Sequence, residues 1–313
     1  MNKLTSIFRR LRLGEKFKHQ YSCHPNFDIK RGAERCTIVW KGRAIAEVAL
    51  AHTLSHQYKG ACFTVATGPS LAEIDLKQLA AFDTISLNCA IKKFNDAGLT
   101  PTHCIVVDRR VFENQWACIR DSILSGANCF FSYVGLSRIC EREPELLQHG
   151  NIYLIESISR KFGVPRVSKS DLLKQAANDA EIFLDEKFPE LCRAVGFSAN
   201  LRKGLFSGKT VATWSTQLAP ALGYQQNFII GMDLGGTGKK HFYADGNHAP
   251  PDFMRDYEPY IRVCFEQAKR ASLAMGFEVY NLSKDSTLPH EIIPKISMEQ
   301  ALTLATVHNQ NNY

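Results

Sequence analysis

Short apolar runs that alternate with helical stretches are the feature that most constrains how this chain can fold. The runs are Cys62–Ala66, Thr84–Leu87, His103–Val107 and Ala127–Tyr133. Each has the length and composition of a β-strand, and Gln115–Ser125 between two of them is predicted to be a helix. Strands that alternate with helices form a parallel sheet. We therefore expect an α/β fold: a Rossmann-like parallel sheet with flanking helices, which makes a single nucleotide-binding domain with a smaller lid or acceptor region.

The second half of the chain is less regular but continues this pattern. Its expected elements are helices at Asp171–Lys187, at Thr210–Leu222 (capped by Gly223) and at about Tyr257–Met275, with strands at Asn227–Ile230 and Phe277–Asn281. Between them, the loop Leu234–Asp252 is long enough to be a lid. The expected parts are a basic amphipathic arm and lead-in (1–58), a Rossmann-like domain (59–290) with a lid loop at about 234–256, and a C-terminal tail (291–313).

The positive charge of the chain is concentrated at its N-terminus. The net charge is +7, and residues 1–31 hold eight Lys and Arg against Glu15 and Asp28, a net +6. In the same arm, apolar residues follow helical spacing with arginines between them, as in Leu4, Phe8 and Leu11. This pattern is typical of helices on anionic membranes, so residues 1–20 are expected to contact such a surface; alternatively, they pack on the body. Nucleic acid is not an expected partner, because its binding proteins spread basic and aromatic residues over the fold.

Composition indicates an ordinary globular protein of the cytosol. The chain has 313 residues and is 45% hydrophobic, so it can bury a large core. It contains no run of the roughly 18–20 apolar residues that a membrane-spanning helix needs, and we expect no secretory signal. None of its ten cysteines form a C-x-x-C pair, so they are predicted to be buried small hydrophobes, with no zinc site or disulfide framework.

The first candidate site is the turn Thr67-Gly68-Pro69-Ser70, which follows a predicted strand. Gly68 allows the backbone to approach a ligand closely, and Pro69 stiffens the turn. Ser70 is expected to cap the next helix, with Glu73 completing a capping box. A helix start of this kind favours phosphate, although a plain strand–turn–helix would have the same sequence.

Further polar residues follow other predicted strands. Asn88, Asp108 and Asp233 each come directly or almost directly after an apolar run, and the carboxyl ends of parallel strands meet at one edge of a sheet. Ser207 and Gly208 precede the helix Thr210–Leu222 and could hold the other end of a nucleotide. The chain has no Walker-type lysine motif and no G-x-G-x-x-G in the first βα turn, which argues against ordinary ATPase or dinucleotide chemistry.

Two histidines in the loop after Asp233 are candidates for a general base. His241 and His248 follow the glycine-rich stretch Gly235-Gly236-Thr237-Gly238, which would make a hinge. An imidazole titrates near neutral pH, so either histidine could accept a proton during catalysis. The alternative for each is a solvated loop residue.

A set of motifs gives the chain a family resemblance. The motifs, in order, are Thr67-Gly68-Pro69-Ser70-Leu71, Leu87-Asn88, Ser207-Gly208, Ala221-Leu222-Gly223-Tyr224, Gly231-Met232-Asp233 and Tyr280-Asn281-Leu282-Ser283. This order resembles the bacterial sialyltransferases that use a cytidine monophosphate (CMP) sugar without a metal. More closely, residues 60 to 285 resemble the lipopolysaccharide core transferases that add the third 3-deoxy-D-manno-octulosonic acid (Kdo) residue, the KdoIII transferases.

The resemblance implies a role for each matching residue. Gly68, Pro69, Ser70 and Asn88 would contact the CMP phosphate and ribose, while Ser207, Gly208 and Asp233 would surround the cytidine. Ser132 would lie near the donor sugar, and Asp108 belongs to the same strand-end set. His241 or His248 would deprotonate the acceptor hydroxyl, and Tyr243 would hydrogen-bond the leaving phosphate.

The resemblance also implies a reaction. The protein would move Kdo from CMP-Kdo to the Kdo region of the lipid A–core acceptor, with inversion and with no metal or other cofactor; the chain has no obvious D-x-D metal motif. Such an enzyme would be cytoplasmic and peripheral on the inner face of the inner membrane. Two alternatives stay open: an ATP-dependent enzyme like the pterin diphosphokinases, which share a similar glycine turn, and a non-catalytic regulator of surface-polysaccharide assembly.

Overall fold

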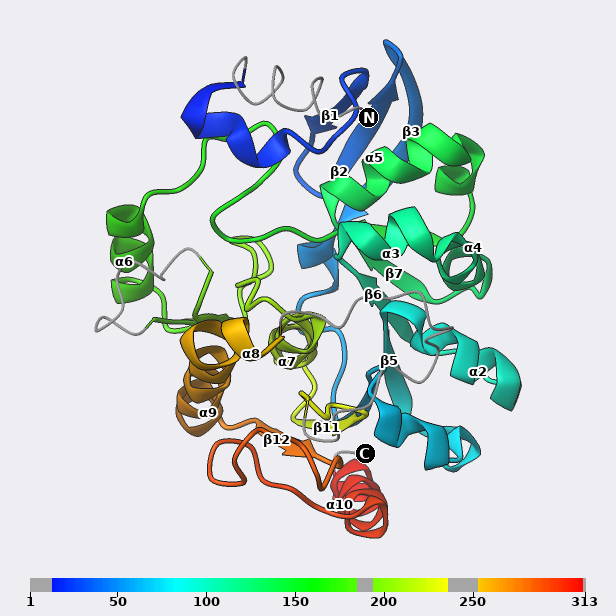
Figure 1. The fold of residues 1–313 in the computed structure, drawn as a ribbon, viewed down its shortest axis with the longest axis vertical. Helices are drawn as coiled ribbons and strands as arrows, with labels where there is room; N and C mark the ends of the chain where they lie inside the picture. The colour runs from blue at the N-terminus through cyan, green and yellow to red at the C-terminus, as the bar shows by residue number, and fades with distance from the viewer. Residues whose placement is uncertain (1–12, 185–193, 236–252, 312–313) are drawn as a thin grey trace.

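A mixed β-sheet with helices on both faces forms the body of the molecule (Figure 1). The computed structural model describes residues 13–184, 194–235 and 253–311. Within these ranges the large sheet has ten strands in the order β1-β2-β3-β8-β7-β6-β5-β4-β11-β12. The expected α/β fold with a Rossmann-like parallel sheet is confirmed by this strand order.

The central part of the sheet is parallel. Its strands are β4 (Ala61–Val65), β5 (Asp83–Leu87), β6 (His103–Val106), β7 (Asn128–Phe131), β8 (Asn151–Leu154), β11 (Gln226–Ile230) and β12 (Glu278–Asn281). All of these strands except β8 were predicted from the sequence. Because neighbouring strands run in the same direction, their carboxyl ends lie along one edge.

Three strands near the N-terminus extend this sheet. They are β1 (Phe27–Arg31), β2 (Arg35–Trp40) and β3 (Arg43–Leu50), which pair antiparallel with each other, while β3 runs parallel to β8. The lead-in expected over 1–58 therefore contains part of the sheet. In β1, charged residues alternate with buried ones, as in a strand with only one buried face. Because of this alternation, the segment was not predicted to be a strand.

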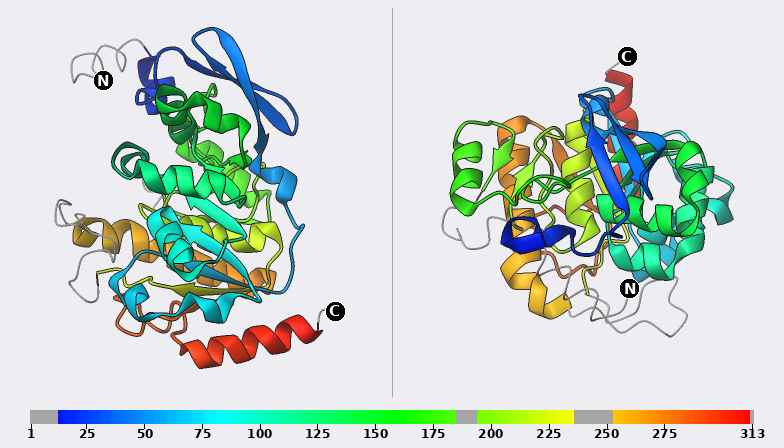
Figure 2. Two further views of the ribbon diagram at one scale, coloured as in Figure 1. Left: turned by 90° about the vertical axis from the view of Figure 1, so that its right-hand side faces the viewer. Right: turned by 90° about the horizontal axis from the view of Figure 1, so that it is seen from above.

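Helices cover the two faces of the sheet separately (Figures 1 and 2). One face carries α2 (Ile91–Ala97), α3 (Arg109–Asn114), α4 (Trp116–Leu124), α5 (Tyr133–Arg142) and α10 (Met298–Asn311); the other carries α7 (Val211–Leu222), the π-helix η7 (Tyr257–Arg262) and α9 (Val263–Met275). The short helix α8 (Phe253–Asp256) leads directly into η7. Neighbouring strand residues such as Cys62 and Phe63 belong to different core clusters, because alternate side chains point to opposite faces.

Short 3₁₀ helices fill several of the connections. They are η1 (Lys18–Gln20), η2 (Ala51–Leu54), η3 (Pro69–Glu73), η4 (Leu76–Leu79), η5 (Asn88–Ala90) and η6 (Pro144–Gln148). Residues 13–17 are helical as well. Gly223 takes the left-handed conformation at the end of α7, with φ 111°, which confirms the predicted cap.

Two predicted elements differ from the structure. The helix expected over Asp171–Lys187 ends early: α6 spans Lys169–Ala177, and the chain then forms β9 (Ile182–Phe183), which pairs with β10 (Phe197–Ser198). The residues expected to form a tail contain α10, which buries Ala301 and Ala305 against the sheet. The side-chain carbonyl of Asn309 also accepts a hydrogen bond of 2.9 Å from the N–H of Ala61.

The buried cysteines match the sequence prediction. The nine cysteines within the described ranges are all buried, and none of them forms a disulfide. In that part of the chain, no helix combines the length and apolarity required to cross a bilayer.

Candidate active site

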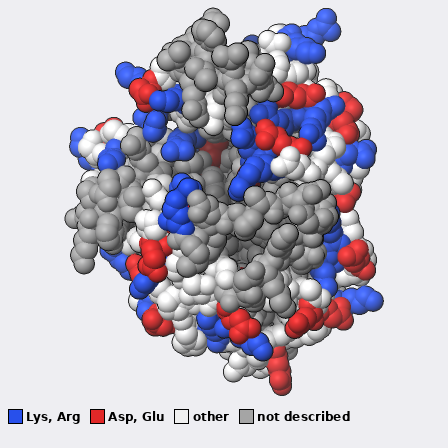
Figure 3. All heavy atoms as spheres, in the orientation of Figure 1, with Lys and Arg blue, Asp and Glu red and all other residues white. Residues whose placement is uncertain are grey.

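The strand-end residues singled out from the sequence lie along one edge of the sheet. Ser132 follows β7, Asn88 follows β5 and Asp233 comes shortly after β11, with Gly68 after β4 between the last two. Asp108, after β6, completes the row. Figure 3 shows the molecule in the orientation of Figure 1, with a hollow bordered by Lys and Arg side chains. The structure therefore brings together polar groups that are far apart in the sequence.

Gly68 and Asp233 are in direct contact. The N–H of Gly68 donates to the carbonyl of Gly231 at 2.9 Å, and the N–H of Ser70 donates to Asp233 Oδ2 at 2.9 Å. A Cβ placed on Gly68 would lie 2.3 Å from Asp233 Oδ2 and 2.4 Å from the carbonyl oxygen of Gly231. No side chain fits at this position, so glycine is required by the close approach of two strand ends.

The capping box expected at Ser70 and Glu73 is wrong. Residues Pro69–Glu73 form a 3₁₀ helix whose N-cap is Gly68, with no side-chain cap. The Ser70 hydroxyl instead lies 3.1 Å from the hydroxyl of Ser283, just after β12. Asp233, 163 residues away, takes over the capping function by accepting from the Ser70 N–H.

Two buried oxygens at this edge lack partners. The side-chain oxygen Oδ1 of Asn88 and Oδ1 of Asp233 are both buried without a hydrogen-bond partner among the described residues. Asn88 also takes a left-handed backbone conformation, with φ 50°, which is uncommon for a residue other than glycine. Unsatisfied buried acceptors are rare in folded proteins, and these two could accept hydrogen bonds from the hydroxyl or amino groups of a ligand.

Asp108 and Ser132 both cap helices. Asp108 accepts from the N–H of Arg110 at 2.9 Å and forms an ion pair of 2.7 Å with the guanidinium of the same residue. Ser132 accepts from the N–H of Gly135 at 3.2 Å and donates to the carbonyl of Val107 at 3.3 Å. A ligand contact through Asp108 would therefore include the Arg110 cation.

The turn at Ser207 and Gly208 lies just before α7 and packs closely against a residue of that helix. Gly208 has φ 49°, and a Cβ there would lie 2.4 Å from the Thr213 hydroxyl. The helix cap is Thr210, two residues further on. Gln217, a buried residue of α7, was not predicted from the sequence; its side chain accepts from the N–H of Phe206 at 2.8 Å and donates to the carbonyl of the same residue at 2.9 Å.

The predicted catalytic residues His241, His248 and Tyr243 lie outside the described residues. The residues on either side of their segment are joined through Thr287: its N–H donates to the carbonyl of Asp233 at 3.2 Å, and its carbonyl accepts from the Tyr257 hydroxyl at 2.9 Å. Both flanks of the segment therefore lie close to the end of β11.

One motif residue lies at the opposite edge of the sheet. The Tyr224 hydroxyl donates to Asp83 Oδ2 at 2.9 Å and lies 3.1 Å from His103 Nε2. Asp83 and His103 begin β5 and β6, so this cluster ties together the amino ends of the strands. Burial lowers the pKa of His103 to about 3, so the ring is neutral at physiological pH. Tyr224 is a structural residue.

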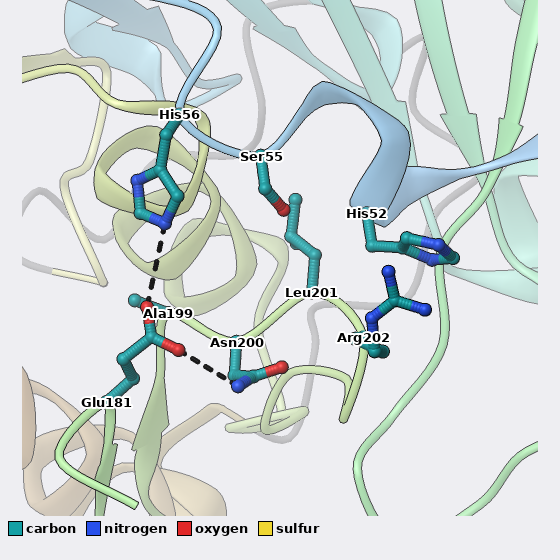
Figure 4. Close-up of a pocket in the computed structure, with 8 residues that line it drawn as sticks. All are labelled: His52, Ser55, His56, Glu181, Ala199, Asn200, Leu201 and Arg202. Atoms are coloured by element: carbon teal, nitrogen blue, oxygen red, sulfur yellow. Dashed lines mark hydrogen bonds and ion pairs between the residues drawn. The ribbon is translucent and has the colours of Figure 1, made fainter. Parts of the chain in front are cut away.

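A separate pocket lies beyond the end of β3 (Figure 4). It is lined by His52, Ser55, His56, Glu181, Ala199, Asn200, Leu201 and Arg202. Glu181 lies 3.7 Å from His56 Nε2 and accepts from the side chain of Asn200 at 2.9 Å. Burial lowers the pKa of His52, and the nearby Arg202 lowers it further. No residue predicted from the sequence lines this pocket.

Comparisons with known proteins point to one family. A sequence model of the family described as "3-deoxy-D-manno-octulosonic acid transferase WaaZ" matches residues 44–299. A protein of Escherichia coli (strain K12) described as "Probable 3-deoxy-manno-octulosonic acid transferase" is 22% identical over 248 residues, covering 74% of this chain and 81% of the relative.

Solved structures of two other glycosyltransferases are similar in part. The sialyltransferase CstII from Campylobacter jejuni, in complex with CMP, shares 14% identity over 75% of this chain and 84% of its own, with a TM-score of 0.43. The MAf glycosyltransferase from Magnetospirillum magneticum AMB-1 shares 13% identity over 95% of this chain and 41% of its own, with a TM-score of 0.46. The fold assignment rests on the strand order, not on these overlaps.

Proposed function

The chain belongs to the family of 3-deoxy-D-manno-octulosonic acid transferases, and we propose that it moves Kdo from CMP-Kdo to the Kdo region of the lipopolysaccharide inner core, adding the third Kdo. The observation that carries the proposal is the pair of unpartnered oxygens on Asn88 and Asp233, on either side of the Gly68 turn. A pyrimidine nucleoside offers hydroxyl and amino donors that match such acceptors.

The donor would bind with its nucleotide across the strand ends. Gly68, Pro69, Ser70 and Asn88 would contact the CMP phosphate and ribose, and Ser207, Gly208 and Asp233 would surround the cytidine. The close packing of Gly68 on Asp233 supports this arrangement, because it holds the turn after β4 against the residues that follow β11, so that both can contact one nucleotide. Ser132 and Asp108, further along the edge, would lie towards the donor sugar.

The reaction would be a single displacement with inversion. The acceptor oxygen forms a bond to the anomeric carbon of Kdo as the bond from that carbon to the CMP phosphate breaks. His241 or His248 takes the proton of the acceptor hydroxyl, and Tyr243 donates a hydrogen bond to the phosphate as its charge develops. We propose that no metal or other cofactor takes part, because the chain has no obvious D-x-D motif.

The N-terminal arm would hold the enzyme at the inner face of the inner membrane, where the lipid A–core acceptor is exposed to the cytoplasm. The net +6 of residues 1–31 supports this placement, since anionic lipids attract such segments. The described part of the arm contacts Tyr133, just after β7, and Arg166 in the loop 157–168, so a membrane-bound arm would bring the site close to the acceptor.

A transfer assay tests the proposal. We expect CMP release from CMP-Kdo that depends on a Kdo-bearing lipid A acceptor, persists in EDTA and gives a product of inverted anomeric configuration. His241→Ala or His248→Ala is expected to lower the rate about 10²- to 10⁴-fold, the usual contribution of a general base. If neither CMP-Kdo nor another CMP-sugar is consumed with acceptor present, the proposal is wrong. AMP formed from ATP and a hydroxymethylpterin would favour the diphosphokinase alternative instead.

A further inference from the structure

The N-terminal segment packs against the edge of the site, although it lies outside the matched residues 44–299. The Tyr133 hydroxyl, one residue after Ser132, donates to the carbonyl of His19 at 3.3 Å. His19 Nε2 lies 2.9 Å from the carbonyl of Lys161, and the N–H of Arg166 donates to the carbonyl of Lys16 at 2.8 Å. Residues 13–20 and the loop 157–168 after β8 therefore form one continuous surface next to Ser132.

Buried polar contacts fix this surface to the sheet and to α5. Arg138 is only 8% exposed and donates to the carbonyl of Ser22 at 3.0 Å, while it also pairs with Glu113 and Glu141. At the end of β8, Glu156 accepts from the Arg31 guanidinium at 2.7 Å and from the N–H of Phe162 at 2.8 Å. Groups mounted on such contacts are held in place before a ligand arrives.

The surface is strongly cationic. Residues 13–20 and 157–168 contribute Lys16, Lys18, Arg160, Lys161 and Arg166, and the carboxylate among them is Glu15, which pairs with Lys18 and Arg166. Glu156 is already paired with Arg31. Lys16 and Arg160 are exposed. We define the cationic wall as Lys16, Arg160 and Arg166; Lys161 is not part of it, because its ammonium group donates to the carbonyl of Arg202 at 2.8 Å and burial lowers its pKa.

His19 does not add to this charge. Burial lowers the pKa of its imidazole, and the charges of Arg160 and Arg166 lower it further, against the hydrogen bond to the Lys161 carbonyl, which raises it. Other ionisable groups that contact the segments of the wall include Glu15, Lys18, Arg31, Tyr133 and Glu156. The positive charge of the wall therefore comes from its Lys and Arg side chains.

We propose that the cationic wall binds carboxylate or phosphate groups of the acceptor glycan and so positions the acceptor against the donor sugar. The wall adjoins Ser132, on the side away from Asn88, Gly68 and Asp233, where the proposed nucleotide would lie. Guanidinium groups recognise carboxylate and phosphate with strong, directional hydrogen bonds. This inference rests on the proposed function, because it assigns the acceptor end of the same site.

Single substitutions test whether the anionic group that the wall binds belongs to the acceptor or to the donor. Arg160→Gln and Arg166→Gln are each expected to raise the KM for a Kdo-bearing lipid A acceptor about tenfold, as the loss of a charge-assisted hydrogen bond does. The KM for CMP-Kdo and the dissociation constant for CMP should stay within about twofold of the wild-type values. Arg43→Gln is the matched control. It removes the same charge at the first residue of β3 and should change neither KM.

The outcomes are distinct. If Arg160→Gln and Arg166→Gln raise the KM for CMP-Kdo and leave that for the acceptor unchanged, the wall binds the donor carboxylate and the inference is wrong. If both variants behave like Arg43→Gln, the wall binds neither substrate, and the inference is again wrong while the proposed transfer stands. If the wild-type protein transfers no sugar at all, the proposed function is contradicted instead. Calorimetry with CMP on the same samples then shows whether the protein binds the nucleotide.

Discussion

At the scale of single residues, the site combines one position with no room for a side chain and two oxygens with no partner. Gly68 is confined by Asp233 and Gly231, whereas Asn88 and Asp233 each keep a buried acceptor unsatisfied. Such features oppose stability in the absence of a ligand. Both can therefore be tested by variants in which CMP affinity and the free energy of unfolding are measured together.

Asn88→Gly is expected to weaken CMP binding about tenfold and to leave the free energy of unfolding nearly unchanged. Glycine adopts the left-handed backbone of this position, with φ 50°, and the change removes an acceptor that has no partner in the folded protein. Titration calorimetry with CMP and urea denaturation measure the two quantities. A loss of stability without a loss of affinity would show that the Asn88 oxygen serves the fold.

Gly68→Ala is expected to abolish measurable CMP binding and to destabilise the protein by about 1–3 kcal/mol, because its methyl group would overlap the Asp233 carboxylate. Gly98→Ala is the control: Gly98 has open space around it but a φ of 67°, so only backbone strain of about 1 kcal/mol is expected, with unchanged CMP affinity. Equal CMP affinities for both variants would contradict the close-approach interpretation.

At the scale of elements, the end of β12 supports the turn after β4. Asn281 accepts from the N–H of Ser283 at 3.0 Å and donates to the carbonyl of Met232 at 3.3 Å, and the Ser283 hydroxyl contacts that of Ser70. This explains why the Tyr280-Asn281-Leu282-Ser283 motif accompanies the glycine turn in the sequence.

Ser283→Ala is therefore expected to weaken CMP binding about fivefold, the effect of one hydrogen bond, while the melting temperature changes little. If Ser283 acts through Ser70, it should have little further effect in a Ser70→Ala background. Calorimetry on the two single variants and the double variant gives the coupling. Fully additive losses would show that the two hydroxyls act independently.

The sequence predicted most of the parallel strands because they are short runs of largely apolar residues, as in β4 and residues 228–230 of β11, which are buried on both faces. It did not predict β1, where charged residues alternate with buried ones, nor β8, where Asn151 is exposed and Tyr153 is half-buried. The role of Ser70 could not be predicted from its neighbours in the sequence, because its N–H donates to Asp233, which is far along the chain. Contacts between residues that are far apart in the sequence cannot be predicted from the spacing of neighbouring residues.

At the scale of the whole molecule, the two edges of the sheet have different functions. The carboxyl edge holds the candidate site, whereas the amino edge holds the cluster of half-buried Asp83 with buried His103 and Tyr224. The network at the amino edge should affect stability without affecting ligand binding, and its buried histidine makes stability depend on pH.

Stability is expected to fall by about 2 kcal/mol between pH 7 and pH 5 through His103 alone. The folded-state pKa of about 3 lies below the unfolded value of 6.5, so the unfolded chain binds more protons as the pH falls. The stabilisation is therefore complete above about pH 6.5 and is lost as the pH falls towards 3. Urea denaturation of the wild type and of His103→Gln at both pH values measures it. The variant should show a smaller loss, and an equal loss would assign the pH dependence to other groups.

The central claim is that the carboxyl edge of the sheet binds a cytidine nucleotide, and a crystal structure of the protein soaked with CMP tests it most directly. We predict density for CMP across the ends of β4, β5 and β11, with its hydroxyl or amino groups within hydrogen-bond distance of Asn88 Oδ1 and Asp233 Oδ1. CMP bound elsewhere, for example in the pocket lined by His52 and Arg202, with both oxygens still unpartnered, would contradict it.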